Sequence, residues 1–276
     1  MAIPKIIHYV WLGGKEKPEL FYRCLESWKK YCPDWEIKEW NESNFDFNES
    51  LYARQSYELK KYGFVPDYIR AKVLYEYGGV YLDTDVELTK TLDELIDNDF
   101  LISFENEVHV ETAVLASSKN HPFAKIMSTF YLDYPYIYNG KPDLTPSTPI
   151  WTYFLKKYYG FKLKNSKQVL NSLIENDSST VTVLPYEYFS PINYTTKVLT
   201  KTENTYAIHY FNATWFTGKL KKQEKFLKNV HKIFGKKIFA CFTKSWVKSV
   251  FRKLSKRIKK YNIDVLSSKL ETKKEK

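Results

Sequence analysis

The spacing of hydrophobic residues in residues 1–130 alternates between the patterns typical of strands and of helices. Short apolar or alternating runs predict buried strands at 3–11, 36–40, 80–82, 99–106 and 112–116. Apolar residues at helical spacing predict helices at 18–31, 51–62, 64–77 and 121–130. Because strands and helices follow one another along the chain, we predict an α/β fold.

The clearest change of period joins the helix at 64–77 to the strand at 80–82. Gly78 predicts a left-handed stop at the end of this helix, and the strand runs into Asp83 and Asp85. On an extended chain, carboxylates two residues apart leave the same face, about 6.5–7 Å apart. Two oxygen donors at that spacing can engage Mg²⁺ or Mn²⁺. An isolated acidic pair is more often a solvated loop, so the surrounding sequence decides between the two interpretations.

An acid and a cation occupy the helix before this strand. Asp67 lies near the positive end of the helix dipole, and Arg70 follows three residues later on the same face. The ordinary interpretation is a surface ion pair of little energetic weight. Because ligands of open α/β sheets bind at the carboxyl ends of strands, the alternative is a pair that holds a ligand beside Asp83.

Three other places carry candidate polar residues. The strand at 99–106 ends in Glu105 and Asn106, and Thr148 lies in a Pro-rich turn before another helical run. His209 follows a short apolar run, where a histidine is usually buried and hydrogen-bonded. Taken alone, none of these positions specifies a function.

The run Pro66-Asp67-Tyr68-Ile69-Arg70, followed by Gly78-Gly79-Val80-Tyr81-Leu82-Asp83-Thr84-Asp85, closely resembles the signature of DXD sugar glycosyltransferases. It is similar in particular to glycosyltransferase family 32, the capsular-polysaccharide and yeast initiating-mannosyltransferase-like enzymes. The catalytic domains of clostridial glucosylating toxins share the pattern. The resemblance covers roughly residues 3 to 218 and implies the GT-A fold, a single Rossmann-like nucleotide-diphospho-sugar domain with a mixed sheet.

The resemblance also implies a role for each candidate residue. The implied catalytic residues are Asp67, Arg70, Asp83 and Asp85, and the implied metal ligands are Asp83, Asp85 and His209. The residues implied to bind the nucleotide sugar are His8, Val10, Trp11, Asp67, Arg70, Asp83, Asn212 and Trp215. The acceptor is expected to contact Glu105, Asn106 and Thr148. The last assignment is the weakest, because Ser147-Thr148-Pro149 lacks the glycine of the family's usual Thr-Gly-Pro.

The activity implied by the resemblance is a metal-dependent hexosyl transfer with retention at the anomeric carbon. We expect Mn²⁺ or Mg²⁺ as cofactor and UDP-galactose, UDP-glucose or a UDP-N-acetylhexosamine as donor, with GDP-mannose less favoured. No residue marks itself as a covalent nucleophile, so front-face transfer and double displacement both remain open. The expected acceptor is a growing, lipid-linked cell-surface glycan such as a capsular polysaccharide. The alternative is a toxin-like, protein-modifying glycosyltransferase, which the small size of the chain makes the weaker candidate.

The net charge of the chain is unevenly distributed. The whole sequence carries 43 basic and 32 acidic residues, a net charge of +11. Residues 219–276 hold 20 of the basic and 4 of the acidic residues, which leaves 23 basic and 28 acidic residues in 1–218. This asymmetry predicts a boundary near Gly218, between a catalytic domain at 1–218 and a basic tail at 219–276.

The tail contains the pattern of an amphipathic helix at 239–261. Its apolar positions are Phe242, Trp246, Val247, Val250, Phe251, Leu254 and Ile258, and its cationic positions are Lys244, Lys248, Arg252, Lys256 and Lys259. Arg257 is the one charge within the apolar sector. A cationic face with an embedded Trp predicts association with an anionic membrane surface. The alternative is a helix packed on the domain or on a partner, and no motif supports nucleic-acid binding.

The cysteines and the apolar runs bear on the compartment. Cys24, Cys32 and Cys241 are odd in number and lack metal-ligand spacing, which favours a reducing environment. The sequence shows no apolar signal segment after Met1 and no apolar run of about 18 residues. We therefore expect a cytoplasmic protein that associates with the inner face of the membrane.

Overall fold

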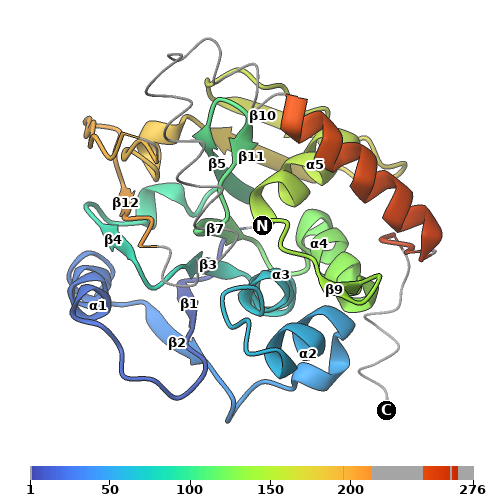
Figure 1. Cartoon of the computed structure of the whole chain (residues 1–276). Coiled ribbons are helices and arrows are strands. Elements are labelled where there is room, and N and C mark those ends of the chain that lie inside the picture. Colours follow the sequence, from blue (N-terminus) through green and yellow to red (C-terminus); the bar gives the residue numbers. More distant parts are fainter. Residues whose placement is uncertain (1, 195, 213–244, 262, 267–276) are drawn as a thin grey trace.

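A central mixed sheet organises the computed structural model, which describes residues 2–194, 196–212, 245–261 and 263–266 (Figure 1). The sheet has 8 strands in the order β10-β11-β5-β7-β3-β1-β2, with β6 paired to β5 beside this path. Its strands are β1 (Ile6–Val10), β2 (Glu36–Trp40), β3 (Gly79–Leu82), β5 (Phe100–Asn106), β6 (His109–Val110), β7 (Val114–Ser117), β10 (Gln168–Asn171) and β11 (Thr180–Leu184). β1 pairs in parallel with β2 and with β3, and β11 pairs in parallel with β5, whereas β7 is antiparallel to both of its neighbours. The predicted α/β fold with a mixed sheet is confirmed.

Helices cover both faces of this sheet. They are α1 (Glu19–Tyr31), α2 (Leu51–Glu58), α3 (Pro66–Tyr77), α4 (Pro122–Asp133) and α5 (Ser147–Tyr159), with short 3₁₀ turns η1 (Phe47–Glu49), η2 (Asp93–Leu95) and η3 (Tyr186–Tyr188). In β3, Val80 and Leu82 pack in the same apolar cluster as α1, whereas Tyr81 packs in the cluster that contains α2 to α5. This alternation is what a strand buried on both faces requires.

Two glycines allow α3 to turn directly into β3. Gly78 has a φ of 70° and a ψ of −160°, so the stop is a positive-φ extended residue instead of the predicted left-handed one. A Cβ on Gly78 would lie 2.7 Å from the Lys119 amide nitrogen, and one on Gly79 would lie 2.6 Å from the Ile6 carbonyl oxygen. Only glycine fits both the dihedral angles and the close approach of the backbone.

A small second sheet lies beside the end of β3. β4 (Val86–Leu88) pairs antiparallel with β12 (Ala207–His209), and His209 is opposite Val86. A third sheet is the hairpin of β8 (Ile137–Tyr138) and β9 (Lys141–Pro142). The β4–β12 ladder was not predicted, and it is the contact that carries His209 to the aspartates.

The C-terminal helix at 245–260 packs on the domain, along α4 and α5 (Figure 1). Val247, Val250 and Leu254 are buried, and the last two belong to the main apolar cluster. Most of the apolar face that the sequence predicted to enter a membrane is therefore covered by the protein itself, which was the alternative interpretation, whereas Trp246 is 46% exposed.

The one charge within that apolar sector, Arg257, explains how the helix is fixed. Its guanidinium forms an ion pair with the buried Asp143 and donates to the Tyr134 hydroxyl 2.7 Å away. It also lies over the Tyr138 ring, 4.1 Å from the ring centroid. A charge in the apolar stripe thus marks a docking contact with the domain.

Several sequence-based predictions concern residues outside the described part of the chain. Residues 239–244 of the predicted helix, the boundary at Gly218 and Cys241 all lie outside the described residues. Cys24 and Cys32 are buried and are not joined in a disulfide. Among the described helices, none combines the length and apolarity that crossing a bilayer demands.

Candidate active site

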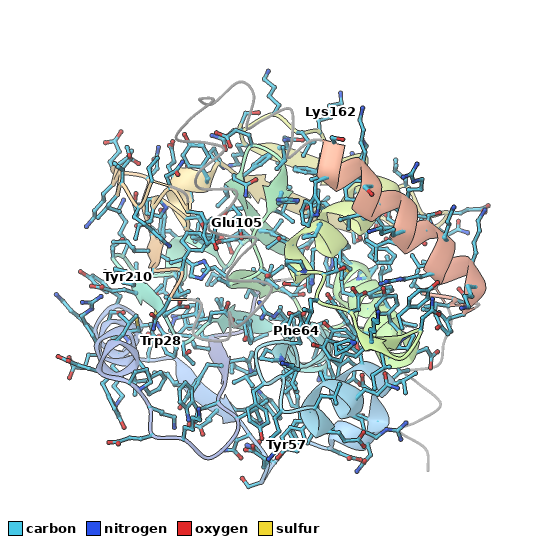
Figure 2. The ribbon with its side chains drawn as sticks, viewed as in Figure 1. Trp28, Tyr57, Phe64, Glu105, Lys162 and Tyr210 are labelled. Carbon is cyan, nitrogen blue, oxygen red and sulfur yellow. The ribbon has the colours of Figure 1, made fainter. Side chains whose placement is uncertain are left out.

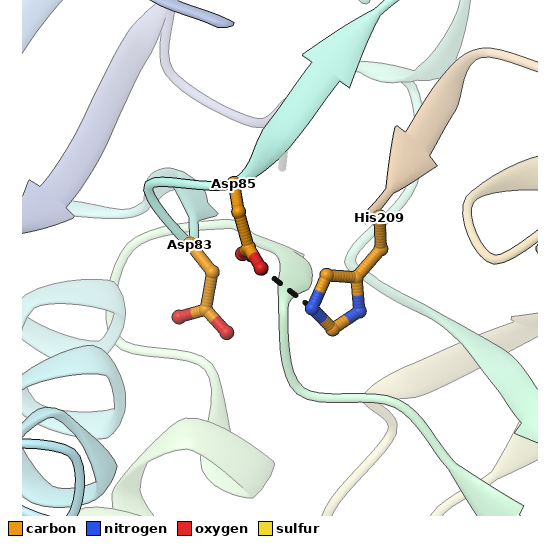
Figure 3. Close-up of side chains that lie close together, drawn as sticks. All are labelled: Asp83, Asp85 and His209. Carbon is orange, nitrogen blue, oxygen red and sulfur yellow. Dashed lines mark ion pairs between the residues drawn. The ribbon is translucent and has the colours of Figure 1, made fainter. Parts of the chain in front are cut away.

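The end of β3 and the β4–β12 ladder bring two carboxylates and an imidazole together (Figure 3). One ligand atom each of Asp83, Asp85 and His209 lies within 4.8 Å of the others. His209 Nε2 is 3.5 Å from Asp85 Oδ1. Three residues from two distant parts of the sequence therefore form one cluster, as the resemblance implied.

The backbone around the aspartates is a turn and not the extended chain that the sequence suggested. The Asp83 amide donates to the Ala113 carbonyl at 2.8 Å, and the Val86 amide donates to the Asp83 carbonyl at 3.1 Å. This turn brings the two carboxylates closer than the predicted spacing of about 6.5–7 Å on a strand. The amide of Asn212 donates to Asp85 Oδ2 at 2.8 Å and holds the second carboxylate in place.

Arg70 links α3 to the aspartate turn. Its side chain is 5% exposed, and Nη2 lies 3.5 Å from Asp67 Oδ1 and 3.4 Å from Asp83 Oδ1. Nη1 donates to the Thr112 carbonyl, and Nε donates to the Pro66 carbonyl at 3.2 Å. The ordinary interpretation of a surface ion pair is wrong, because the guanidinium is buried and its donors are taken up by the protein. Arg70 therefore orients Asp83 from within the fold.

Asp67 lies behind Arg70 and is buried. Burial raises the pKa of Asp67 to about 6, although the Arg70 charge and the Tyr52 hydroxyl, 3.1 Å from Oδ2, oppose this effect. The Tyr81 hydroxyl donates to Asp83 Oδ1 at 2.9 Å. Within the described part of the chain, the side-chain contacts of Asp83 all involve Oδ1, which leaves Oδ2 available to a ligand.

The predicted nucleotide-binding residues in and just after β1 differ in whether they can reach a ligand. β1 and β3 are parallel, with His8 opposite Tyr81, so Val10 and Trp11 lie at the same sheet edge as Asp83. His8 is fully buried, and its Nε2 contacts the Gly78 carbonyl at 2.8 Å while its Nδ1 accepts from the Trp40 indole at 3.1 Å. Both ring nitrogens are therefore engaged, and His8 has a structural role instead of the expected nucleotide contact.

The remaining predicted residues lie around the cluster or outside the described residues. Asn212 is exposed next to Asp85, whereas Trp215 lies outside the described residues. Asn106 caps the β5–β6 turn by accepting from the amides of Val108 and His109, and its amide donates to Glu105 at 2.9 Å. Burial raises the pKa of Glu105, which Figure 2 labels near the middle of the molecule, to about 7.

Sequence reasoning missed two residues that the structure places at the site. Glu111, between β6 and β7, is fully buried, and its Oε2 lies 4.0 Å from His209 Nδ1. Burial raises the pKa of Glu111 well above its usual range. The only sequence signal for this residue was a lone acid in an apolar segment.

The second missed residue is Ser147. Its hydroxyl lies 2.8 Å from that of Thr112, whose carbonyl binds Arg70, whereas the predicted Thr148 uses its carbonyl to accept from Thr152 within α5. Ser147 belongs to the same motif as Thr148, whose expected contact with the acceptor stays a prediction. Its neighbours identify it as part of the network behind Asp83.

The donor set of this cluster suits a divalent cation. Two carboxylates and one imidazole are the ligands that Mn²⁺ accepts, and Mg²⁺ favours the two carboxylates. Opposite ligands of an octahedral ion with bonds of about 2.1 Å are about 4.2 Å apart. Because the three ligand atoms lie within 4.8 Å of one another, small side-chain movements would let one cation contact them directly or through water.

The sequence of this chain is similar to those of several known proteins. An inositol phosphoceramide mannosyltransferase of Schizosaccharomyces pombe is 32% identical over 128 residues, which is 44% of this chain and 35% of that protein. A second one is 24% identical over 173 residues, 55% of this chain and 53% of that protein, so the match spans about half or less of these relatives. An uncharacterized glycosyltransferase of Acanthamoeba polyphaga mimivirus is 25% identical over 244 residues, 84% of this chain and 91% of that protein.

Solved structures and a family model complete the comparison. The PaToxG glycosyltransferase superposes with a TM-score of 0.43 at 19% identity, over 56% of this chain and 70% of that chain. Residues 18–101 match the model described as glycosyltransferase sugar-binding region containing DXD motif. The segment that carries Asp67, Arg70, Asp83 and Asp85 is therefore similar to the DXD-containing sugar-binding region of glycosyltransferases.

Proposed function

We propose that this protein is a metal-dependent, retaining glycosyltransferase of the family 32 type. The observation that carries the proposal is the cluster of Asp83, Asp85 and His209 at the end of β3. The two aspartates belong to the segment that is similar to the DXD sugar-binding region, and His209 comes from outside that segment. The three residues offer a set of ligands for Mn²⁺ or Mg²⁺, whose charge would stabilise the diphosphate leaving group.

Each residue of the site has a distinct task in this proposal. Asp85 would bind the cation, with its second oxygen held by the backbone amide of Asn212. Asp83 uses Oδ2 toward the cation or a donor hydroxyl, while Arg70 and Tyr81 hold its Oδ1. Asp67, with Arg70 between it and Asp83, keeps the guanidinium in position. A preorganised arrangement of this kind needs little reorganisation when charge develops on the leaving group.

The donor and acceptor are proposed from the relatives and the sheet edge. Val10 and Trp11 would contact the base of a UDP-hexose. Because two relatives are named inositol phosphoceramide mannosyltransferases, GDP-mannose belongs in the same donor screen, and a lipid-linked acceptor is the first class to test. The outward cationic face of the helix at 245–260, instead of its apolar face, would place the enzyme at an anionic membrane.

Hydrolysis of the donor without acceptor tests the activity. We expect one nucleotide sugar to be hydrolysed only with Mn²⁺ or Mg²⁺, and the sugar released or transferred first to keep its anomeric configuration in proton NMR. Asp85→Asn should lower the rate by at least about 100-fold because the direct metal ligand is lost. The matched control is Asp34→Asn, an exposed carboxylate paired with Lys5, which should keep the wild-type rate. Metal-independent hydrolysis, or unchanged turnover by Asp85→Asn at saturating Mn²⁺, contradicts the proposal.

A further inference from the structure

The two ring nitrogens of His209 face different acidic groups. Nε2 points to Asp85 Oδ1 at 3.5 Å, whereas Nδ1 lies 4.0 Å from Glu111 Oε2. Nδ1 is fully shielded from solvent and makes no hydrogen bond to any described residue. A buried polar atom without a partner is rare and calls for an explanation. Because a carboxyl oxygen lies 4.0 Å from this nitrogen, a small movement would complete a hydrogen bond between them.

Glu111 is held in one position on the other side of this gap. Ser190 donates to its Oε2, and Ser103 donates to its Oε1 at 3.1 Å. The Glu111 amide also donates to the Ser103 carbonyl at 2.9 Å. A carboxyl oxygen has two lone pairs, so Oε2 can accept from Ser190 and from a second donor. Burying a carboxyl group costs free energy unless hydrogen bonds satisfy it.

We propose that Glu111 is the positioning residue of the candidate metal centre. Its Oε2 accepts a hydrogen bond from the Nδ1–H of His209, which selects the tautomer whose Nε2 lone pair points toward Asp85 and the cation. A shift of about 1 Å brings the two atoms to hydrogen-bond distance. A histidine that binds a metal through one nitrogen generally donates the other to a carboxylate or carbonyl. The inference deepens the proposed function and rests on it.

The tautomer of His209 is the most direct test and needs no metal. Long-range ¹H–¹⁵N NMR of the imidazole in the full chain distinguishes a proton on Nδ1 from one on Nε2. The chain contains 5 histidines, so the spectrum of His209→Gln assigns the signal. We expect the proton on Nδ1 in the wild type and its loss from Nδ1 in Glu111→Ala. Glu111→Gln keeps an acceptor oxygen and should retain the wild-type tautomer.

Binding of Mn²⁺ to the metal-free protein gives the second readout. Calorimetry should show an affinity about 10- to 100-fold weaker in Glu111→Ala, with most of it restored in Glu111→Gln. Glu107→Gln, which neutralises an exposed acid of the turn between β5 and β6, should bind Mn²⁺ as the wild type does. If Glu111→Ala does not fold, Ser190→Ala should weaken Mn²⁺ binding in the same direction by freeing the carboxyl.

The outcomes separate this inference from the proposed function. A folded Glu111→Ala protein with the wild-type tautomer and wild-type Mn²⁺ affinity overturns the inference, as does a wild-type His209 that carries its proton on Nε2. A tautomer that depends on Glu111, in a protein that hydrolyses no nucleotide sugar, supports the positioning contact and rejects the proposed activity instead.

Discussion

Among the described acids whose pKa is raised, Glu105 has the simplest environment. Burial raises its pKa from 4.5 to about 7, and the Asn106 amide opposes this effect. The folded state therefore holds the Glu105 proton more tightly than the unfolded state does. The resulting contribution to stability is fully present below about pH 4.5 and is lost as the pH rises through about 7.

This behaviour predicts a pH-dependent effect of Glu105→Gln. The amide is neutral at every pH and can still accept from Asn106, so it removes the cost of burying a charge. We expect the variant to have a higher Tm than the wild type at about pH 8 and nearly the same Tm at about pH 4.5. Differential scanning fluorimetry at both values checks this, with the exposed neighbour Glu107→Gln as the control. Equal Tm differences at the two pH values would show that the carboxyl does not titrate as described.

At the scale of elements, the helix at 245–260 contributes to the domain through a few side chains. Leu254 is 1% exposed and belongs to the main apolar cluster. Leu254→Ala should therefore lower the free energy of unfolding by about 2–5 kcal/mol. The exposed Arg252→Ala on the same helix should change it by less than about 0.5 kcal/mol. Urea denaturation measures both variants, and equal stabilities would mean that this helix does not pack on the domain in solution.

The elements also show where the sequence was sufficient and where it was not. The helix Pro66–Tyr77 and the strands Glu36–Trp40 and Gly79–Leu82 were predicted within a residue or two, because local period and glycine punctuation determine them. β4 and β12 have three residues each and pair across more than 100 residues, so neither carries a usable local pattern.

The candidate residues also divide into those marked by a local sequence pattern and those that only tertiary contacts reveal. Asp83, Asp85, Asp67 and Arg70 were found because they are close together in the sequence. Glu111 and Ser147 were missed because only tertiary contacts bring them to the site. His8 was misjudged because a strand pattern does not reveal that both ring nitrogens are already engaged.

For the whole molecule, the basic C-terminal segment remains the proposed membrane contact, but through its cationic face instead of its apolar face. The outer face of the helix at 245–260 exposes Lys248, Arg252, Lys256 and Lys259, and its apolar face is covered except at Trp246. Binding through this surface would be electrostatic, with about 1 kcal/mol for each cation near an anionic membrane and strong screening by salt.

Liposome cosedimentation tests the proposed membrane surface. We expect the protein to bind vesicles that contain phosphatidylserine, to detach at high salt and to ignore neutral vesicles. Replacing Lys248, Arg252, Lys256 and Lys259 by Glu should abolish binding without loss of donor hydrolysis. Binding that survives this charge reversal would exclude the helix as the membrane contact.

The β4–β12 ladder has a consequence for how the protein becomes active during synthesis. His209 joins the aspartates only when β12 pairs with β4, a contact between segments separated by more than 100 residues. Contacts of such long range form late in folding. A nascent or prematurely terminated chain that lacks β12 carries both aspartates but not the imidazole. Only a chain that extends through β12 can therefore acquire the complete ligand set, and under the proposed function a shorter fragment should not hydrolyse nucleotide sugar.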